Sequence, residues 1–333
     1  MASFLTTRIL RPAAYAMIGL AYAALLTGCD QRELCYDHNH SANVRVEFDW
    51  FFARNADVEG MTVLFYNEDD PSAEPIRYDL PGRDGGMVKL QPGRWRPVAY
   101  NNDTEAILYR GQSSPSTLEA YTRESSVEEG TQIYTRGSAM PRAANAEDET
   151  VILEPDMLYG ATGELLILGP DDTNSTLTLQ PEMRVTEIDI TIHDVPNLEY
   201  AGQFGGALSG LAPSVMMASG ALGAGCVTEA FTCHIIDDTT LQMKFRIFGH
   251  CPEGGLLNTH MLTIYAILAD GTKWYYTKDI TTELHKASEE QRNHIVDVDL
   301  NDLPLPMPIV NGSGLQPSVD TWNNIEIEVE MNN

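Results

Sequence analysis

The histidines are the first residues that could do chemistry, because a neutral imidazole is a common metal ligand. The chain has eight histidines, and only His38 and His40 lie close together, beside Cys35. Such a pair could bind a metal loosely, but in a polar segment it is more typical of a solvated tether. No C-x-x-C pair occurs either, so a zinc ribbon is not indicated. We predict no metal site and no cofactor.

The serine, acidic and glycine-rich motifs form no catalytic constellation. Ser209 lies in the stretch Gly206–Gly210 without a G-x-S-x-G elbow, so we interpret it as a small packing residue. A G-x-x-x-x-G-K-[ST] loop and an H-E-x-x-H pair are also missing. The acids Glu68–Asp70 and Asp171–Asp172 lack EF-hand spacing and predict solvated turns. We expect no catalytic residue and a chain that is not an enzyme.

Cys29 lies in a context that predicts a covalent lipid. Two arginines precede an apolar run from Ala13 to Leu26, which is too short to cross a bilayer and is typical of a secretory signal. The run ends in Leu-Thr-Gly directly before Cys29, an arrangement that resembles a bacterial lipobox, where the signal is cut before the cysteine and acyl chains are added. Two or more acyl chains give stable anchoring. The alternative is an ordinary signal peptide with a chance cysteine.

The other cysteines leave the disulfide pattern open. With Cys29 acylated, Cys35, Cys226, Cys233 and Cys251 remain, and four cysteines in an exported chain allow three pairings. The last three lie close together in sequence, so one disulfide among them is a candidate. Free buried thiols are the alternative.

The net charge excludes one class of partner. The chain carries a formal charge of −27, and its first 28 residues hold two arginines and no acid, so the rest is near −29. Such a surface repels nucleic acid and anionic lipid headgroups. We therefore expect a membrane contact only through the lipid, and no nucleic-acid partner.

The first half of the chain has the period of two that is typical of strands. Val44, Val46, Phe48 and Trp50 alternate with polar residues and predict one buried face. A second apolar run covers residues 61–66. The runs 87–90 and 95–100 flank a Pro-Gly pair, which predicts a β-hairpin. Residues 111–149 are expected to be loop with short strands.

The second half repeats this character. Val185, Ile188, Ile190 and Ile192 predict a buried strand face, and residues 202–225 predict an extended loop or short helix because they are small and apolar. Residues 261–268 and 273–276 flank an Asp-Gly pair, a strong hairpin signal. Residues 281–293 form the only convincing helical stretch. The last predicted strand alternates Ile325, Ile327 and Val329 with glutamates, and these three residues are candidate strand donors.

These elements predict a mainly β protein with two β-sandwich domains in series. The turn-rich segment near residue 170 is the expected boundary. We expect a signal peptide at 1–28, a lipidated tether at 29–41, an N-terminal sandwich at 42–169 and a C-terminal sandwich at 170–333.

Three short segments extend this picture. The chain resembles a family of fimbrillin-like lipoproteins of the Bacteroidetes in these segments. The first is the lipobox followed by Glu33–His38 and the strand at 44–50, and the other two are Pro155–Ala161 and Gly206–Leu211. That family includes membrane-proximal anchor subunits of type V pili. The resemblance implies transthyretin-like sandwiches and assembly by strand donation. It also implies a cut after an arginine in shaft subunits, for which Arg45 or Arg54 would be candidates; an anchor that keeps its lipid would escape the cut.

The leading functional hypothesis is therefore a lipid-anchored fimbrial anchor or accessory subunit at the outer membrane, exposed at the cell surface, with other fimbrial subunits as partners. The rival is a surface lipoprotein that binds a carbohydrate or host ligand, since sandwich folds also hold ligands in their loops. Exposed aromatic platforms would favour the rival. Trp95 and Trp274 are expected in strands and cores, whereas Trp322 could be exposed. A hydrolase would need a deep pocket with convergent acids.

Overall fold

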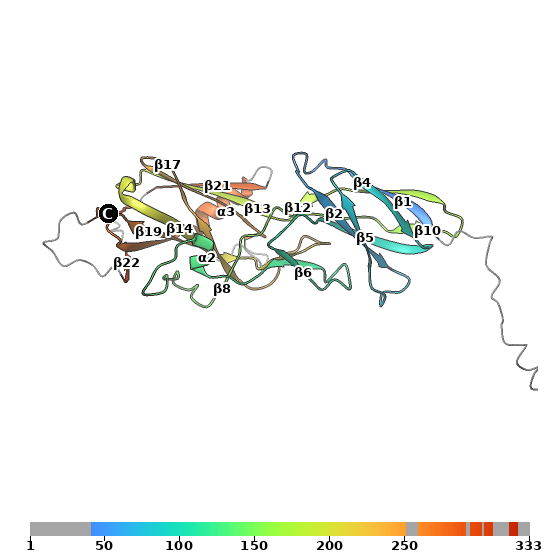
Figure 1. Cartoon of the computed structure of the whole chain (residues 1–333), viewed down its shortest axis with the longest axis horizontal. Coiled ribbons are helices and arrows are strands. Elements are labelled where there is room, and N and C mark those ends of the chain that lie inside the picture. Colours follow the sequence, from blue (N-terminus) through green and yellow to red (C-terminus); the bar gives the residue numbers. More distant parts are fainter. Residues whose placement is uncertain (1–40, 251–258, 291–293, 302, 309–319, 326–333) are drawn as a thin grey trace, which may run out of the picture. The chain divides into compact units, whose positions relative to one another are not determined.

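The computed structural model describes residues 41–250, 259–290, 294–301, 303–308 and 320–325. These residues form a mainly β fold, which confirms the predicted class (Figure 1). Its described helices are short: α2 (Val127–Thr131), α3 (Thr281–Glu289) and the 3₁₀ helix η1 (Leu198–Tyr200). None of them has the length and apolar character that a bilayer crossing requires.

Two facing sheets enclose the first core. In one sheet, β1 lies between a parallel and an antiparallel neighbour. In spatial order, the first sheet consists of β11 (Asn174–Leu179), β1 (Ala42–Phe48) and β4 (Gly85–Leu90). The facing sheet consists of β12 (Glu182–Met183), β9 (Tyr159–Thr162), β5 (Gly93–Asn101), β2 (Gly60–Asn67) and β3 (Ile76–Pro81). A further strand, β10 (Leu166–Leu168), also pairs with β5. Val44, Val46, Phe48 and Trp50 are all at most 9% exposed in this core, as the alternation predicted.

The predicted hairpin between residues 87–90 and 95–100 is wrong. β4 pairs with β1, whereas β5 pairs with β2 and β9, so the chain passes from one sheet to the facing sheet at the Pro-Gly corner. Gly93 adopts a positive φ of 149° there. The corner places Leu90 and Trp95 in the same core from opposite sheets. Burial of both side chains therefore determines that β4 and β5 lie in facing sheets, which the Pro-Gly turn signature alone does not determine.

A second pair of sheets encloses the largest core cluster. Ile188, Ile190 and Ile192 of the central strand lie in it, as predicted. Val185 is buried too, but it precedes β13 and belongs to another cluster, so it does not share that strand face. In spatial order, one sheet consists of β17 (His234–Asp237), β18 (Thr240–Ile247), β13 (Thr186–His193) and β21 (Ile295–Asn301). The other consists of β22 (Trp322–Asn324), β20 (Lys273–Asp279), β19 (Met261–Leu268), β14 (Ala201–Leu211), β16 (Val227–Thr232) and β8 (Thr150–Ile152).

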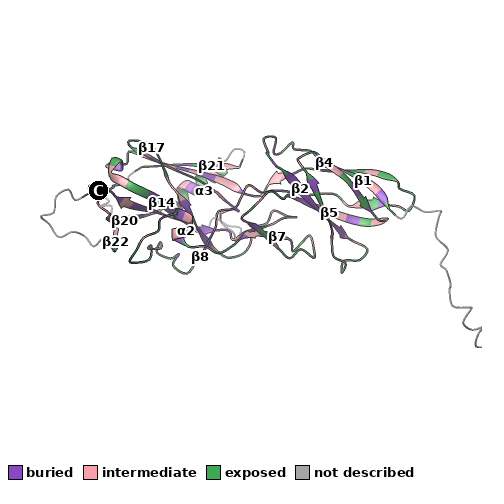
Figure 2. Cartoon of the chain, in the orientation of Figure 1, coloured by how far each residue is buried: buried purple, intermediate pink, exposed green. Residues whose placement is uncertain are grey.

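The expectation of a loop or short helix at 202–225 is wrong for most of this segment, because it contains β14 and β15 (Ser214–Met216). Buried residues colour most of β14 and of β2 in Figure 2. The small residues of β14 have a packing role. A Cβ on Gly205 would lie 2.4 Å from Thr131 of α2, and one on Gly206 would lie 2.4 Å from the Phe231 ring. Glycine thus lets a helix and an aromatic ring approach the strand closely.

The segment expected to be loop, residues 111–149, contributes more structure than predicted. It holds β7 (Glu119–Thr122), which joins β6 (Ile107–Arg110) and β15 in a three-stranded sheet, and it also holds α2. Ser126 caps α2, because its hydroxyl accepts a hydrogen bond from the Glu129 N–H. α2 packs over β16 and β14 beside a separate cluster of buried residues.

Strand pairing crosses the predicted domain boundary in both directions. β11 follows residue 169 and pairs with β1, whereas β8 precedes it and pairs with β16. The described residues from Ser41 onward belong to one compact unit. The division at residue 169 stays a prediction, and these pairings show that the two sandwiches share segments around it.

Two predictions near the C-terminal end are confirmed. β19 and β20 form the antiparallel hairpin at the Asp-Gly turn, where Gly271 has a φ of 80°. The predicted helix begins at Thr281 and is described to Glu289, with Leu284 buried. Residues 291–293 lie outside the described part of the chain.

Candidate functional site

The edge of β20 is the candidate functional site, because the described residues pair with only part of the strand on that side. β22 runs parallel to β20 and pairs Trp322 with Lys273 and Asn324 with Tyr275. Among the described residues, no strand continues this pairing along the rest of β20. An incompletely paired strand offers backbone N–H and C=O groups to another strand.

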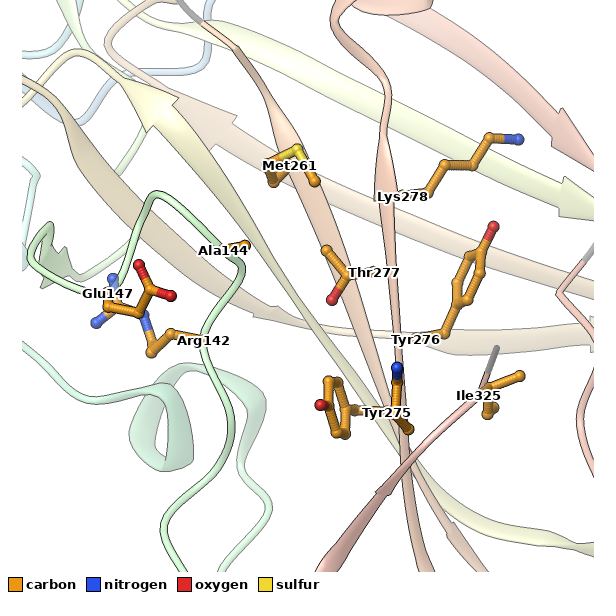
Figure 3. Close-up of a pocket in the computed structure, with 10 residues that line it drawn as sticks. Arg142, Ala144, Glu147, Met261, Tyr275, Tyr276, Thr277, Lys278 and Ile325 are labelled. Atoms are coloured by element: carbon orange, nitrogen blue, oxygen red, sulfur yellow. The ribbon is translucent and has the colours of Figure 1, made fainter. Parts of the chain in front are cut away.

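A groove of about 670 Å³ lies beside this edge. Its lining comes from β19, β20, the end of β22 and the segment before β8: Arg142, Ala144, Glu147, Met261, Tyr275, Tyr276, Thr277, Lys278, Asn324 and Ile325. Figure 3 shows Tyr275 and Thr277 on the side of Arg142 and Glu147, with Tyr276 and Lys278 on the opposite side of β20. This alternation follows from the pleat of a strand.

The segment 320–325 is attached to its own sheet by side-chain and backbone contacts. The Ile325 N–H donates to the Tyr275 carbonyl at 2.9 Å. The Trp322 ring packs edge-on against Tyr265 with ring centroids 5.5 Å apart. Burial raises the pKa of Tyr265, so its hydroxyl stays protonated and donates to the Pro141 carbonyl at 2.5 Å. β22 is therefore anchored to its own sheet.

The backbone of β20 indicates which groups face the groove. The Lys273 carbonyl accepts from the Asn323 side chain, and the Tyr275 carbonyl accepts from Ile325, so odd-numbered residues face the β22 side. Because peptide groups alternate along a strand, Thr277 and Asp279 present their backbone groups to the same edge beyond Ile325. An extended segment with alternate apolar residues could extend the sheet there, and its side chains would enter the groove.

The candidate donor residues are only partly described. Ile325 packs against the second core. Ile327 and Val329 lie outside the described residues. Strand donation by this segment stays a prediction.

The other predicted site residues lie away from this edge or outside the described part. Cys29, Cys35, Cys251, His38 and His40 are outside it. Cys226 and Cys233 are half-buried, and Cys233 forms no disulfide with a described residue. Burial raises the pKa of the Cys233 thiol. The disulfide stays a prediction.

The candidate cleavage arginines are both exposed. Arg45 lies within β1, where its guanidinium pairs with Glu47 at 2.6 Å. Arg54 follows β1 in a turn, and its guanidinium lies 4.9 Å from the ring centre of Phe51. A cut after either residue stays a prediction.

The predicted roles of the acidic turns and of Ser209 can be compared with their contacts. Asp69 accepts from the Arg94 N–H at 2.9 Å, and Asp172 accepts from the Gly169 N–H at 2.6 Å, so these carboxylates hold exposed turns. Ser209 is buried, and its hydroxyl accepts from the Met261 N–H at 3.1 Å.

Sequence reasoning missed one cluster that could hold a metal. The side chains of His250, His260 and His285 offer nitrogen atoms that all lie within 4.8 Å of one another. Their sequence spacing matches no metal-binding motif, and only the folded chain brings them together. No local signal could have indicated them.

Comparison with known proteins places the chain in a family. The family model described as "Domain of unknown function (DUF5119)" matches residues 28–232. This chain belongs to the DUF5119 family. The DUF5119 match begins one residue before Cys29 and ends with β16, so it includes β1–β16 but neither the groove strands β19–β22 nor the three clustered histidines.

A curated relative from Bacteroides ovatus, named there as a candidate fimbrium anchoring subunit, Fim4B, is 28% identical over 204 residues. The alignment covers 61% of this chain and 56% of the relative, so the chain matches little more than half of that protein's length. Among solved structures, a candidate adhesin from Bacteroides ovatus gives a TM-score of 0.57 at 21% identity, covering 91% of this chain and 98% of that one. The fimbrial anchor protein Mfa2 from Porphyromonas gingivalis gives 0.50 at 12% identity, covering 78% and 90%. At these identities the likeness concerns the fold.

Proposed function

We propose that this chain is an accessory subunit of a fimbrium and that it joins a neighbouring subunit by strand addition at the edge of β20. The relative named as a fimbrium anchoring subunit carries this proposal. The groove beside Thr277 and Lys278 supports it physically, because it combines side-chain space with backbone groups that no described strand pairs. The proposal implies transthyretin-like sandwiches and no catalytic turnover.

We propose further that the chain is held at the outer membrane by a lipid on Cys29 and faces the cell exterior. The DUF5119 match starts at residue 28, so the expected signal peptide lies almost wholly outside the matched residues. A fimbrial anchor needs such an attachment, because the fibre otherwise has no fixed end. The charge of the chain makes direct adhesion to anionic lipid unfavourable, so the acyl chains would supply the membrane affinity.

The rival function, binding of a carbohydrate, gains little from the tryptophans, although Phe51, Phe52 and Tyr134 are exposed. All four tryptophans are described, and none is exposed: Trp50 and Trp95 are buried, whereas Trp274 and Trp322 are half-buried. A stacking platform for a sugar ring needs an exposed aromatic face. The expectation that Trp322 could be exposed gives way to its packing against Tyr265.

Site-specific photo-crosslinking tests the proposed function. A photoreactive amino acid at Thr277, in the full chain produced in fimbriated cells, should form an adduct that contains a fimbrial subunit, identified by mass spectrometry. The matched control is the same amino acid at Thr178, an exposed position on the edge strand β11 of another sheet. A subunit adduct from Thr178 alone, or none from Thr277 at equal protein level, would contradict assembly at β20.

A further inference from the structure

Three histidines from separate segments converge in the second sandwich. His250 follows β18 and forms an isolated bridge with Leu211, His260 directly precedes β19, and His285 lies in α3. Their ring centroids are 5.0–5.6 Å apart. His260 is fully buried, whereas His250 is half-exposed. The cluster is therefore largely buried, and His250 is its most exposed member.

A β-bulge in β14 creates this arrangement. The register with β16 changes between Leu208 and Leu211, so two residues, Ser209 and Gly210, oppose one. Gly210 has a φ of 75°, and a Cβ there would lie 2.3 Å from the Thr259 carbonyl and 3.0 Å from His260 Nδ1. Only glycine allows both the backbone conformation and this close approach. Bulges often redirect groups next to functional sites.

The bulge is itself held by a charged side chain. Glu149 Oε2 accepts from the Gly210 N–H at 3.2 Å and from the Thr228 hydroxyl at 2.8 Å. The bulge therefore has a defined geometry, and it directs the Ser209 carbonyl toward the histidine cluster.

The backbone of His260 is fixed on both sides. Its N–H donates to the Thr281 hydroxyl at 2.8 Å, and its carbonyl accepts from the Ile280 N–H at 3.0 Å. These bonds join the start of β19 to the first turn of α3, the helix that carries His285. The main-chain segments that carry the two rings are therefore held together.

Hydrogen bonding defines the form of His260. Its Nδ1 lies 3.1 Å from the Ser209 carbonyl, which can only accept, so Nδ1 carries the proton and Nε2 presents a lone pair. A ligand histidine whose other nitrogen donates to a backbone carbonyl is the usual arrangement in metal sites.

The facing nitrogens are close to metal-ligand geometry. Nε2 of His260 lies 3.0 Å from Nε2 of His285, a distance that suits a hydrogen bond between them. Two imidazoles on one tetrahedral zinc ion, with Zn–N bonds of about 2.0–2.1 Å, have nitrogens about 3.3 Å apart. A change of a few tenths of an ångström would bring this pair to that spacing, with the proton between them moved to Nδ1 of His285. The nitrogen of His250, within 4.8 Å of the other two, would move in by up to about 1.5 Å.

We propose that His250, His260 and His285 form a zinc site. Three imidazoles favour a borderline transition metal over Ca²⁺ or Mg²⁺, which prefer oxygen ligands. Three protein ligands leave the fourth position of a tetrahedral ion to water or another donor. The bound ion would join the bulge region, β19 and α3, which directly follows the β20 edge.

Zinc titration of the full chain tests this site. Isothermal calorimetry with Zn²⁺ should show one saturable site, which Mg²⁺ does not occupy. His250→Ala and His285→Ala should each weaken zinc binding by at least about 10-fold. That is the lower end of the range found when a residue that only supports a metal ligand is changed, so loss of a ligand itself should cost no less. Substitution of Co²⁺ should give the visible absorption of a tetrahedral ion, and this signal should disappear in both variants.

Two matched controls separate this site from other histidines. His234→Ala changes an exposed histidine in β17, and the double variant His38→Ala/His40→Ala removes the pair near Cys35; both should keep full affinity. Loss of binding only in the double variant, or full affinity in both cluster variants, would overturn the proposal. Circular dichroism and thermal melting, both measured in the presence of a chelator, would show whether the metal-free variants are folded. If an alanine variant of the cluster does not fold, the more conservative His285→Gln takes its place in the titration.

Discussion

Arg246 Nη2 lies 2.8 Å from Glu154 Oε1, and this ion pair lies near a third ionisable residue, Glu229, that is only 1% exposed. Among the described residues, Glu229 Oε1 has no hydrogen-bond partner. Burial raises the pKa of Glu229 well above its ordinary value, Glu154 raises it further, and Arg246 opposes the shift only partly. The carboxyl group therefore favours its protonated form in the folded chain.

We predict that Glu229→Gln removes a pH-dependent loss of stability. Between the ordinary pKa of 4.5 and the raised pKa, the folded chain binds one proton more than the unfolded chain. The free energy of unfolding of the natural chain therefore falls as pH rises through this window. Glutamine cannot ionise, so the variant should be more stable than the natural chain at pH 8 and differ least at pH 4. Urea unfolding at both pH values measures this.

The matched control for this prediction is Glu105→Gln at an exposed position. It should leave the pH profile of stability unchanged. An equal stability difference for Glu229→Gln at pH 4 and pH 8 would show that the carboxyl group is not the cause.

Phe48 tests the register of the first sandwich. Its side chain is buried beside Trp50, with ring centroids 6.3 Å apart. We expect Phe48→Ala to reduce the free energy of unfolding by about 3–5 kcal/mol. The neighbouring change Glu47→Ala removes only an exposed pair with Arg45 and should cost about 0–1 kcal/mol. Chemical denaturation that gives similar losses for both would contradict the packing.

Local patterns in the sequence predicted the strands better than their partners. The alternation from Val44 to Trp50 has a single physical cause, one-sided burial, so it can be recognised without knowing the rest of the fold. The Pro-Gly corner near Gly93 misled, because turn chemistry does not specify whether the next strand stays in the same sheet. β14 was missed because Gly205 and Gly206 lack the side chains that mark a strand. Glycine is required at these positions because Thr131 and Phe231 pack too closely to leave room for a side chain.

The candidate sites show the same limit more strongly. The alternation that begins at Ile325 indicated a C-terminal strand, but the groove also needs Arg142 and Met261, which are remote in sequence. The histidine cluster depends on a bulge at Ser209 and Gly210 that brings a carbonyl to His260. A bulge is a property of two paired strands, so a single sequence carries no direct signal for it.

Lipidation is expected to depend on the thiol of Cys29. Cys29→Ser should leave the chain without acyl groups and release it from the membrane, because no second anchor is predicted in the sequence. Membrane fractionation and labelling with a lipid precursor measure both effects. The control Cys35→Ser should remain acylated and membrane-bound. Normal labelling of Cys29→Ser would show that the lipid is attached elsewhere or that the motif is coincidental.

The C-terminal segment can close its own sheet or complete that of a neighbour, and two deletions distinguish these roles. Removing residues 320–333 deletes β22, together with the contacts of Trp322 to Tyr265 and of Ile325 to the second core. If the segment mainly closes its own sheet, this variant should melt at a lower temperature or aggregate, because the edge of β20 is exposed. If it is a donor, the variant should stay folded and lose its subunit partner.

Removing only residues 326–333 keeps β22 and should preserve the fold in both cases, while donation predicts that the partner is still lost. Thermal melting, size-exclusion chromatography and co-purification with the fimbrial subunit give the readouts. A 320–333 deletion that is folded and still binds its partner would contradict both roles.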